Sequence, residues 1–266
     1  MKDGHDVSVT TLRELVRADV LDRVAPEEPL EIQIFGTSLA VLMRTPDHDI
    51  DLVTGFLLTE RIVASVDDIT SVEHCSIAPT PEAADNVVRV MLRAGIAAPV
   101  PSRNFFASSS CGVCGKATIE QALKLGQQVT SEPRVAATTL YALADRLRVE
   151  QTLFTETGGL HGVGLFETNG RLIASREDIG RHNAVDKVIG AAARERIHFD
   201  ETLLLVSGRV SFEIVQKAAA VGVPIVAGIS APSSLAVRFG EELGITVIGF
   251  LRGTSANVYS HERRVV

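Results

Sequence analysis

Residues 202–230, TLLLVSGRVSFEIVQKAAAVGVPIVAGIS, contain two short apolar runs with a helix-like stretch between them. The runs at 202–207 and 224–229 are rich in aliphatic and β-branched side chains, as buried strands are. Ser211 is a suitable N-cap for a helix that continues to Val221 and stops at the following glycine. A strand, one helix and a second strand predict a right-handed crossover between parallel strands.

The same alternation continues along the C-terminal half of the chain. Further elements are predicted at 140–149 (helix), 162–167 and 172–175 (strands), 181–196 (helix), 230–244 (helix) and 245–251 (strand). This order favours an α/β domain, with a largely parallel sheet covered by helices on both faces. Ligands of such sheets bind beyond the carboxyl ends of the strands.

The N-terminal half predicts a smaller α+β unit. Leu30–Phe35 and Ser38–Met43 form a strand pair around Gly36, a short helix begins at Asp49, and Val87–Leu92 is a buried strand. Residues 93–103 have loop composition and lead to a cysteine pair. We therefore expect three regions: a loosely attached, charged arm over 1–26, a small α+β domain over 27–135, and an α/β domain over 136–266.

Composition excludes several classes of protein. With 45% hydrophobic and 22% charged residues, the chain has the composition of a globular protein rather than a disordered or fibrous one. Its 33 acidic and 26 basic residues give a net charge of -7, which opposes general binding to nucleic acid. Prolines and glycines interrupt the longest uncharged interval, and no signal peptide is evident at the N-terminus. We therefore expect a cytoplasmic protein that binds neither nucleic acid nor membrane.

Two of the three cysteines lie in the motif SSSCGVCGK at 108–116. Cys111 and Cys114 precede a predicted helix over 117–125, so backbone N–H groups, the helix dipole and the nearby Lys116 favour the reactive thiolate. Three kinds of chemistry fit such a pair: half of a zinc site, a dithiol redox couple, or a nucleophile that carries sulfur as a persulfide. Two inert, buried cysteines are a fourth possibility, although the polar and glycine neighbours argue against it.

Polar residues also follow the predicted strands. Ser207-Gly-Arg209 comes after one strand, and Phe250, Leu251, Arg252, Gly253, Thr254 and Ser255 are at the end of another. TGGLH at 157–161 places His161 at a strand entrance, where it is either a core histidine or a ligand-facing one. Arg181 and His182 begin a helix whose polar face, with Asn183, Asp186 and Lys187, either meets solvent or holds a polar ligand. Together these residues indicate a pocket for a large anionic ligand.

In this order, the motifs resemble those of the FdhD family, the formate dehydrogenase accessory sulfurtransferases. The residues that carry the resemblance are SCGVCGK at 110–116, TGGLH at 157–161, EDIGRHNAVDK at 177–187, SGRVS at 207–211, SAP at 230–232 and GF at 249–250, with EPL at 28–30, MRTP at 43–46 and GFL at 55–57. They span nearly the whole chain from about residue 27. Single motifs are weak, but their ordered combination is specific.

The resemblance implies a function for these residues. A cysteine desulfurase would donate sulfane sulfur to Cys111, with Cys114 as its helper, and the sulfur would pass to the molybdenum cofactor, bis-molybdopterin guanine dinucleotide, for formate dehydrogenase. Residues 250–255 would contact that cofactor, and a guanine nucleotide such as GDP would mimic part of it. His161, Arg181, His182, Ser207 and Arg209 complete the expected pocket.

The resemblance also implies a three-layer C-terminal domain like the cytidine deaminases, and a homodimer. We expect no catalytic zinc, because the H-x-E and P-C-x-x-C pair of those enzymes is absent from the sequence. Two other hypotheses remain open: a cofactor-binding chaperone without sulfur transfer, and a dithiol oxidoreductase.

Overall fold

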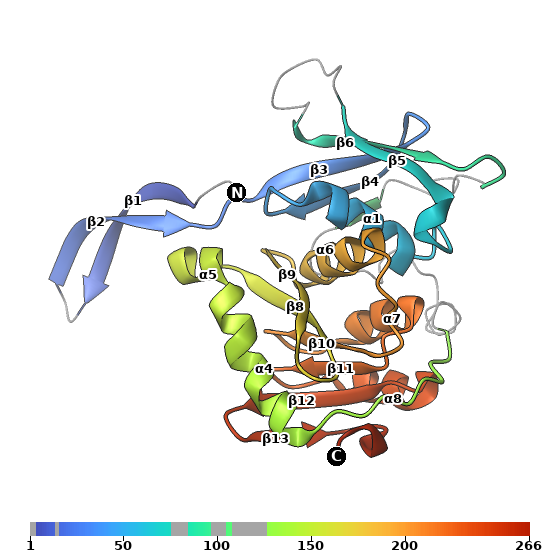
Figure 1. Ribbon diagram of the computed structural model, residues 1–266. Coiled ribbons are helices and arrows are strands. Elements are labelled where there is room, and N and C mark those ends of the chain that lie inside the picture. The colour runs from blue at the N-terminus through green and yellow to red at the C-terminus, as the bar shows by residue number, and fades with distance from the viewer. Residues whose placement is uncertain (1–3, 14–15, 76–84, 97–104, 108–126) are drawn as a thin grey trace.

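The computed structural model describes residues 4–13, 16–75, 85–96, 105–107 and 127–266 (Figure 1). Cys111, Cys114 and the helix predicted at 117–125 lie outside the described residues. Most of the described chain forms two sheets with their helices, and an N-terminal hairpin extends from this body.

The N-terminal sheet has five strands in the order β5-β6-β3-β4-β7. Their bounds are β3 Glu28–Ile34, β4 Thr37–Arg44, β5 Ile69–His74, β6 Val87–Leu92 and β7 Phe105–Ala107. The predicted strand pair is confirmed as β3 and β4, whereas β5 and β7 were not predicted. β6 buries only alternate residues, because Val88, Val90 and Leu92 face the core and the residues between them are exposed. Helix α1, Asp49–Thr59, packs its apolar residues against this sheet.

The C-terminal sheet has six strands in the order β13-β12-β11-β10-β8-β9. Their bounds are β8 His161–Glu167, β9 Leu172–Asp178, β10 Thr202–Val206, β11 Ile225–Gly228, β12 Thr246–Arg252 and β13 Ser255–Val258. Only β10 with β11 and β11 with β12 pair in parallel. The expectation of a largely parallel sheet is therefore wrong, and the sheet is mixed.

Two tight turns explain two of the three antiparallel pairs of this sheet, β8 with β9 and β12 with β13. Asn169 and Gly170 lie between β8 and β9, and Gly170 has a positive φ of 86°. Gly253, with φ of 54°, lies in the turn between β12 and β13. Because such residues adopt the left-handed backbone that short hairpins need, the chain reverses at both places without a crossover helix.

Helices cover both faces of the C-terminal sheet, in three layers (Figure 1). Helices α6 (Arg181–Arg194), α7 (Phe212–Val221) and α8 (Ser234–Leu243) pack on the face that carries Leu204 and Val206. Helix α4, Ala137–Glu150, packs on the face that carries Leu203 and Leu205 and is followed by the short α5, Thr152–Thr157. The alternation of side chains along β10 therefore builds two separate cores. Short 3₁₀ turns are at Val66–Asp68 and Glu262–Arg264.

The two sheet regions meet where α1 crosses α6. A Cβ atom on Gly55 of α1 would lie 1.8 Å from the backbone oxygen of Asp186, and one on Gly190 of α6 would lie 1.9 Å from that of Asp51. Only glycine fits at either position, so the two helix backbones are in direct contact. This crossing fixes the N-terminal sheet against the helices of the C-terminal sheet.

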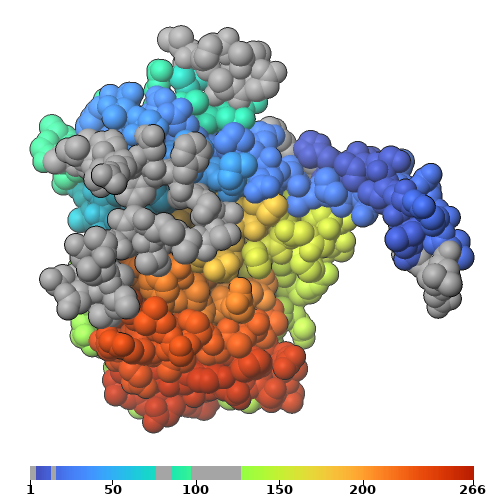
Figure 2. Space-filling model, turned by 180° about the vertical axis from the view of Figure 1, so that it is seen from behind, coloured from blue at the N-terminus to red at the C-terminus, as the bar shows by residue number. Residues whose placement is uncertain are grey.

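The N-terminal segment, expected to be a loosely attached arm, forms an antiparallel hairpin of β1 (His5–Arg13) and β2 (Val16–Val24). Figures 1 and 2 show from opposite sides that it projects away from the rest of the molecule. These two strands were not expected from the sequence, although apolar and polar residues alternate through much of the segment. Within the described residues, no helix is long and apolar enough to cross a membrane.

Candidate functional site at the carboxyl edge of the C-terminal sheet

The predicted strand-end residues lie along one edge of the C-terminal sheet. This carboxyl edge consists of the ends of β10, β11 and β12 and the start of the antiparallel β8. Ser207 links the end of β10 to the start of β8, because its hydroxyl accepts a hydrogen bond from the Gly162 N–H at 3.0 Å and its own N–H donates to the Gly162 carbonyl at 2.9 Å. Phe250 N–H likewise donates to the Ser230 carbonyl at 3.1 Å.

His161 lies beside the turn that follows β10. A Cβ atom on Gly208 would lie 3.2 Å from Nδ1 of His161, so the glycine leaves room for this half-buried imidazole. Burial lowers the pKa of His161, and the positive charges of Arg181 and Arg209 lower it further, although Asp178 opposes them. His161 is therefore neutral near pH 7 and lies in a positive electrostatic environment.

Arg181 supplies an unsatisfied donor at the same place. Its Nε is buried and has no hydrogen-bond partner among the residues that the structure describes. A buried guanidinium donor without a partner is costly, and an anionic group is the partner that suits it best. Arg209, next along the edge, is exposed and adds a second positive charge. The carboxyl edge therefore has the charge and the donors that a phosphate group needs.

His182, the next residue of α6, is largely buried. Its side chain is 12% exposed, and its Nε2 lies 3.3 Å from the Ser211 hydroxyl. Burial lowers the pKa of His182 to about 3, with further lowering by Lys217 and Arg181. Because it is neutral, His182 offers a hydrogen bond and not a charge.

Residues 250–255 are not equivalent in their exposure. The Leu251 side chain is fully buried in the core beneath α4, so only its backbone is available to a ligand. Phe250 has a positive φ of 53°, and the Arg252 guanidinium lies 5.8 Å from the centre of its ring. Arg252, Gly253, Thr254 and Ser255 are exposed on the turn between β12 and β13.

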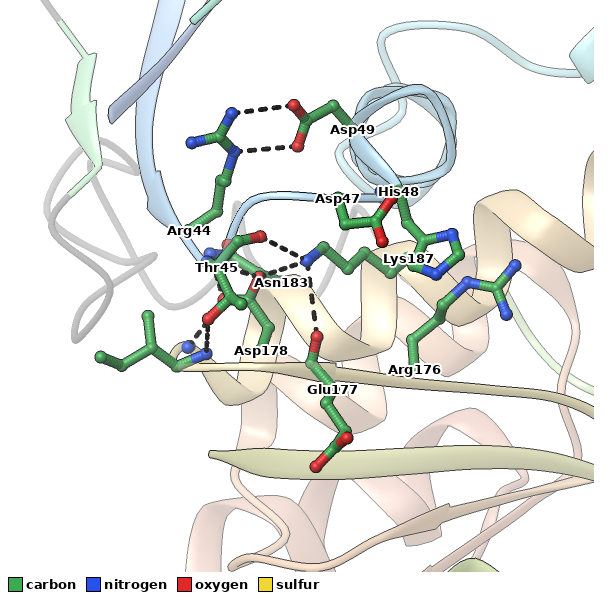
Figure 3. Close-up of polar contacts among 12 residues, drawn as sticks. Arg44, Thr45, Asp47, His48, Asp49, Arg176, Glu177, Asp178, Asn183 and Lys187 are labelled. Atoms are coloured by element: carbon green, nitrogen blue, oxygen red, sulfur yellow. Dashed lines mark hydrogen bonds and ion pairs between the residues drawn. The ribbon is translucent and has the colours of Figure 1, made fainter. Parts of the chain in front are cut away.

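Two other polar residues of α6, Asn183 and Lys187, neither face solvent nor stay free for a ligand. Lys187 is 1% exposed, and its Nζ lies 2.7 Å from an Asp178 carboxylate oxygen and 2.8 Å from the Thr45 carbonyl oxygen, as Figure 3 shows. Asp178 also accepts hydrogen bonds from the backbone N–H groups of Thr45 and Gly180. Asn183 donates to the Met43 carbonyl at 2.7 Å. These residues tie the end of β4 to the start of α6.

Asp186 belongs to a second buried cluster. Its carboxylate accepts hydrogen bonds from Lys217 Nζ at 2.8 and 2.9 Å and from the Thr59 hydroxyl at 2.7 Å. Burial raises the pKa of Asp186 to about 6, against the lowering effect of Lys217. Burial disfavours the charged form of Lys217, but the Asp186 carboxylate outweighs it and the pKa of Lys217 is raised. The pair therefore joins α1, α6 and α7 as an ion pair near pH 7.

A cavity of about 620 Å³ opens beside these contacts and is rich in carboxylates. Arginines already neutralise its two buried aspartates: Arg44 binds Asp49 through two bonds of 2.8 Å, and Arg176 and Arg194 bind Asp51. In the described parts of the chain, no group of three or more His, Cys, Asp or Glu side chains could hold a metal ion.

Sequence reasoning missed the partners that bury the α6 residues. Thr45 and Arg44 occur in the MRTP motif, but nothing in that motif shows that Thr45 bonds Asp178 and Ile179 across the two sheet regions. Lys217 lies in the mostly apolar helix α7. Because a buried lysine is nearly always paired with an acidic residue, its position in this stretch could have indicated a buried ion pair.

Comparison with known proteins adds the family. A family model described as the FdhD/NarQ family matches residues 25–266. The chain belongs to the FdhD/NarQ family. It is 46% identical over 274 aligned residues to the sulfur carrier protein FdhD of Mycobacterium tuberculosis, covering 98% of this chain and 99% of the relative. It is 48% identical to that of Nocardia farcinica, covering 97% and 92%.

The crystal structure of a protein with the same fold is known. The crystal structure of a protein from Desulfotalea psychrophila, described as a formate dehydrogenase accessory protein, covers 99% of both chains with a TM-score of 0.80 at 22% sequence identity. This similarity extends over both sheet regions and confirms a mixed α/β fold with an N-terminal sheet and a C-terminal mixed sheet packed with helices.

Proposed function

We propose that this chain is a sulfur carrier that activates formate dehydrogenase. The observation that carries the proposal is its identity of 46–48% to proteins named sulfur carrier protein FdhD, over 97–98% of this chain. The sequence supplies the thiols that such a function needs, at Cys111 and Cys114. A cysteine desulfurase is the proposed sulfur donor, and formate dehydrogenase is the proposed client.

The proposed reaction is two thiol exchanges. The Cys111 thiolate attacks the terminal sulfur of the donor's persulfide, so that a new S–S bond forms on Cys111 and the donor cysteine leaves as a thiolate. Cys114 then attacks Sγ of Cys111, which releases the terminal sulfur as hydrosulfide to the acceptor and leaves a Cys111–Cys114 disulfide. A cellular dithiol reductant restores the two thiols. Lys116 and the predicted helix over 117–125 would favour the thiolate form of both.

The proposed acceptor is the molybdenum cofactor, bis-molybdopterin guanine dinucleotide, bound at the carboxyl edge. The unsatisfied Nε of Arg181 and the exposed Arg209 support a site for its pyrophosphate, next to His161 and Ser207. The exposed turn at 252–255 and Phe250 support contacts with the guanine part, which GDP would reproduce. His182 would act through its hydrogen bond with Ser211.

We also propose the finer organisation of the molecule. The chain is proposed to consist of an arm over 1–26, an α+β domain over 27–135 and a cofactor-binding domain over 136–266. Three layers around a mixed sheet support a fold of the cytidine-deaminase type for residues 136–266, without catalytic zinc. The protein is proposed to act as a homodimer.

Maturation of formate dehydrogenase in cells that lack this chain tests the proposal. Wild-type chain should restore formate dehydrogenase activity, and Cys111→Ala should not. A protein that only binds and delivers the cofactor needs the carboxyl edge but not the thiols, so full activity with Cys111→Ala would favour that chaperone function instead. A dithiol oxidoreductase would carry no sulfane sulfur on either cysteine.

A further inference from the structure

The hairpin of β1 and β2 has two chemically different faces. Residues paired across an antiparallel ladder share a face, and the pairs Val9 with Val20 and Asp6 with Arg23 fall on opposite faces. The valine face carries Val7, Val9, Val16, Ala18, Val20 and Val24, together with the polar residues His5, Thr11 and Asp22. The opposite face is held by the Arg23–Asp6 ion pair at 3.2 Å and by a 2.7 Å hydrogen bond from Thr10 to Asp19.

Much of the valine face is exposed, although Val7 and Val9 are half-buried. Val16 is 65% exposed, and Val20 and Val24 are each 40% exposed. Contact with the body is made at the base of the hairpin, where Arg23 donates a 2.8 Å bond to Glu156 of α5. Figures 1 and 2 show the hairpin standing clear of both sheets.

A two-stranded hairpin in water is marginally stable unless one face packs on another surface. The face that needs cover is mainly apolar, because its five valines and Ala18 outnumber His5, Thr11 and Asp22 on the same face. The two leucines of the opposite face, Leu12 and Leu21, lie among charged and hydroxyl side chains. The valine face therefore has the composition of an interface that is buried in the working assembly.

We propose that the valine face of each hairpin packs on the body of a second copy of this chain, by reciprocal exchange of the two arms. This inference deepens the proposed homodimer and is independent of the sulfur chemistry.

The size of the hairpin favours a second copy over a different partner. Nine residues per strand span about 30 Å, and two strands offer a face of about 300 Å². One arm on one partner therefore buries about 600 Å² in total, which is less than a stable complex needs. Two arms exchanged around a two-fold axis bury about 1,200 Å², which reaches the range of stable dimers.

Sedimentation velocity of the full chain with adjacent substitutions tests the proposal. Val20→Asp places a charge on the valine face, and Leu21→Asp places the same charge on the opposite face. The wild type should sediment as a dimer of twice the 28.4 kDa chain mass. Val20→Asp should weaken the dimer about tenfold or more, because a charge buried without a partner opposes association. Leu21→Asp should stay within about twofold of the wild type.

The Val20→Asp variant could lose the dimer only because its hairpin no longer folds. Hydrogen exchange on the wild-type protein tests the interface without any substitution. Amides of 5–13 and 16–24 should be protected at concentrations where the dimer forms and should exchange fast on dilution to monomer. Equal protection at all concentrations, or a Val20→Asp protein that stays dimeric, would overturn the role of the hairpin. A monomeric wild type would overturn the homodimer as well, while leaving sulfur loading of Cys111 intact. Protection that requires added formate dehydrogenase would assign the face to the client instead.

Discussion

Gly190 of α6 lies against the backbone of Asp51 in α1, so closely that a Cβ atom on Gly190 would be 1.9 Å from the Asp51 carbonyl oxygen. The N-terminal and C-terminal sheet regions are joined at this contact. Neither helix can move toward the other, and a side chain at this position must push them apart.

We predict that Gly190→Ala destabilises the protein. Helix propensity alone would stabilise α6 by about 1 kcal/mol, because alanine is the better helix former. Overpacking should reverse the sign and cost about 1–3 kcal/mol. Urea unfolding monitored by circular dichroism measures the difference, and a net stabilisation would show that the two helices separate easily.

Loss of the buried Lys187 ammonium should be far more harmful than loss of an exposed one. Lys187→Met leaves the Asp178 carboxylate, which is 0% exposed, without its cation, and we expect a loss of about 3–5 kcal/mol in the free energy of unfolding. Arg238→Met is the control, because Arg238 and Glu242 form an exposed pair within α8 worth less than about 1 kcal/mol. Equal effects of the two substitutions in urea titrations would refute the importance of the Thr45–Asp178–Lys187 contact.

Acidification should destabilise the protein partly through His182. The unfolded chain takes up a proton on this histidine below its ordinary pKa of 6.5, whereas the folded protein does so only near 3. Stability from His182 is therefore present above pH 6.5 and is lost as the pH falls toward 3, by up to about 1.4 kcal/mol per pH unit. His182→Gln should show a shallower loss of stability between pH 6 and pH 4. An unchanged slope would mean that His182 is not shielded from water.

GDP should bind at the carboxyl edge if the cofactor does. We expect GDP to raise the melting temperature of the wild type and Arg181→Met to weaken GDP binding at least tenfold, about 1.4 kcal/mol, because a charge-assisted bond to phosphate is lost. Arg209→Ala should weaken binding less, since Arg209 is exposed. Titration calorimetry measures both, with Arg238→Ala as the control, because Arg238 is exposed and pairs with Glu242 on α8. Equal GDP affinity in all variants would show that GDP binds elsewhere on the protein.

The sequence predicted the position of the carboxyl edge because strand ends are local features. Ser207, Gly208 and Arg209 follow an apolar run, and parallel strands bring such ends to the same side of a sheet. The strands β8 and β9 were predicted, but their antiparallel pairing was not, although Asn169-Gly170 is a hairpin signal. The alternation of strands and helices along the rest of the domain favoured parallel pairing instead.

Burial of the α6 polar residues could not be predicted in this way. Lys187 bonds Thr45, which is 142 positions away, and Asp186 bonds Thr59, which is 127 positions away. Periodicity places Lys187 on a face of its helix but does not show which distant segment will cover that face. The same limit applies to Leu251, whose neighbours in sequence suggested a ligand contact and whose side chain lies in the core.

Intact mass spectrometry tests the sulfur carrier most directly. The full chain is incubated with a cysteine desulfurase and cysteine, in the wild-type, Cys111→Ala and Cys114→Ala forms, with Cys75→Ala as the control for the buried third cysteine. The account predicts one added sulfur atom on the wild type and on Cys75→Ala, its loss in Cys111→Ala, and its retention in Cys114→Ala, which lacks the thiol that assists release. No sulfur adduct on any form beside an active desulfurase would contradict it.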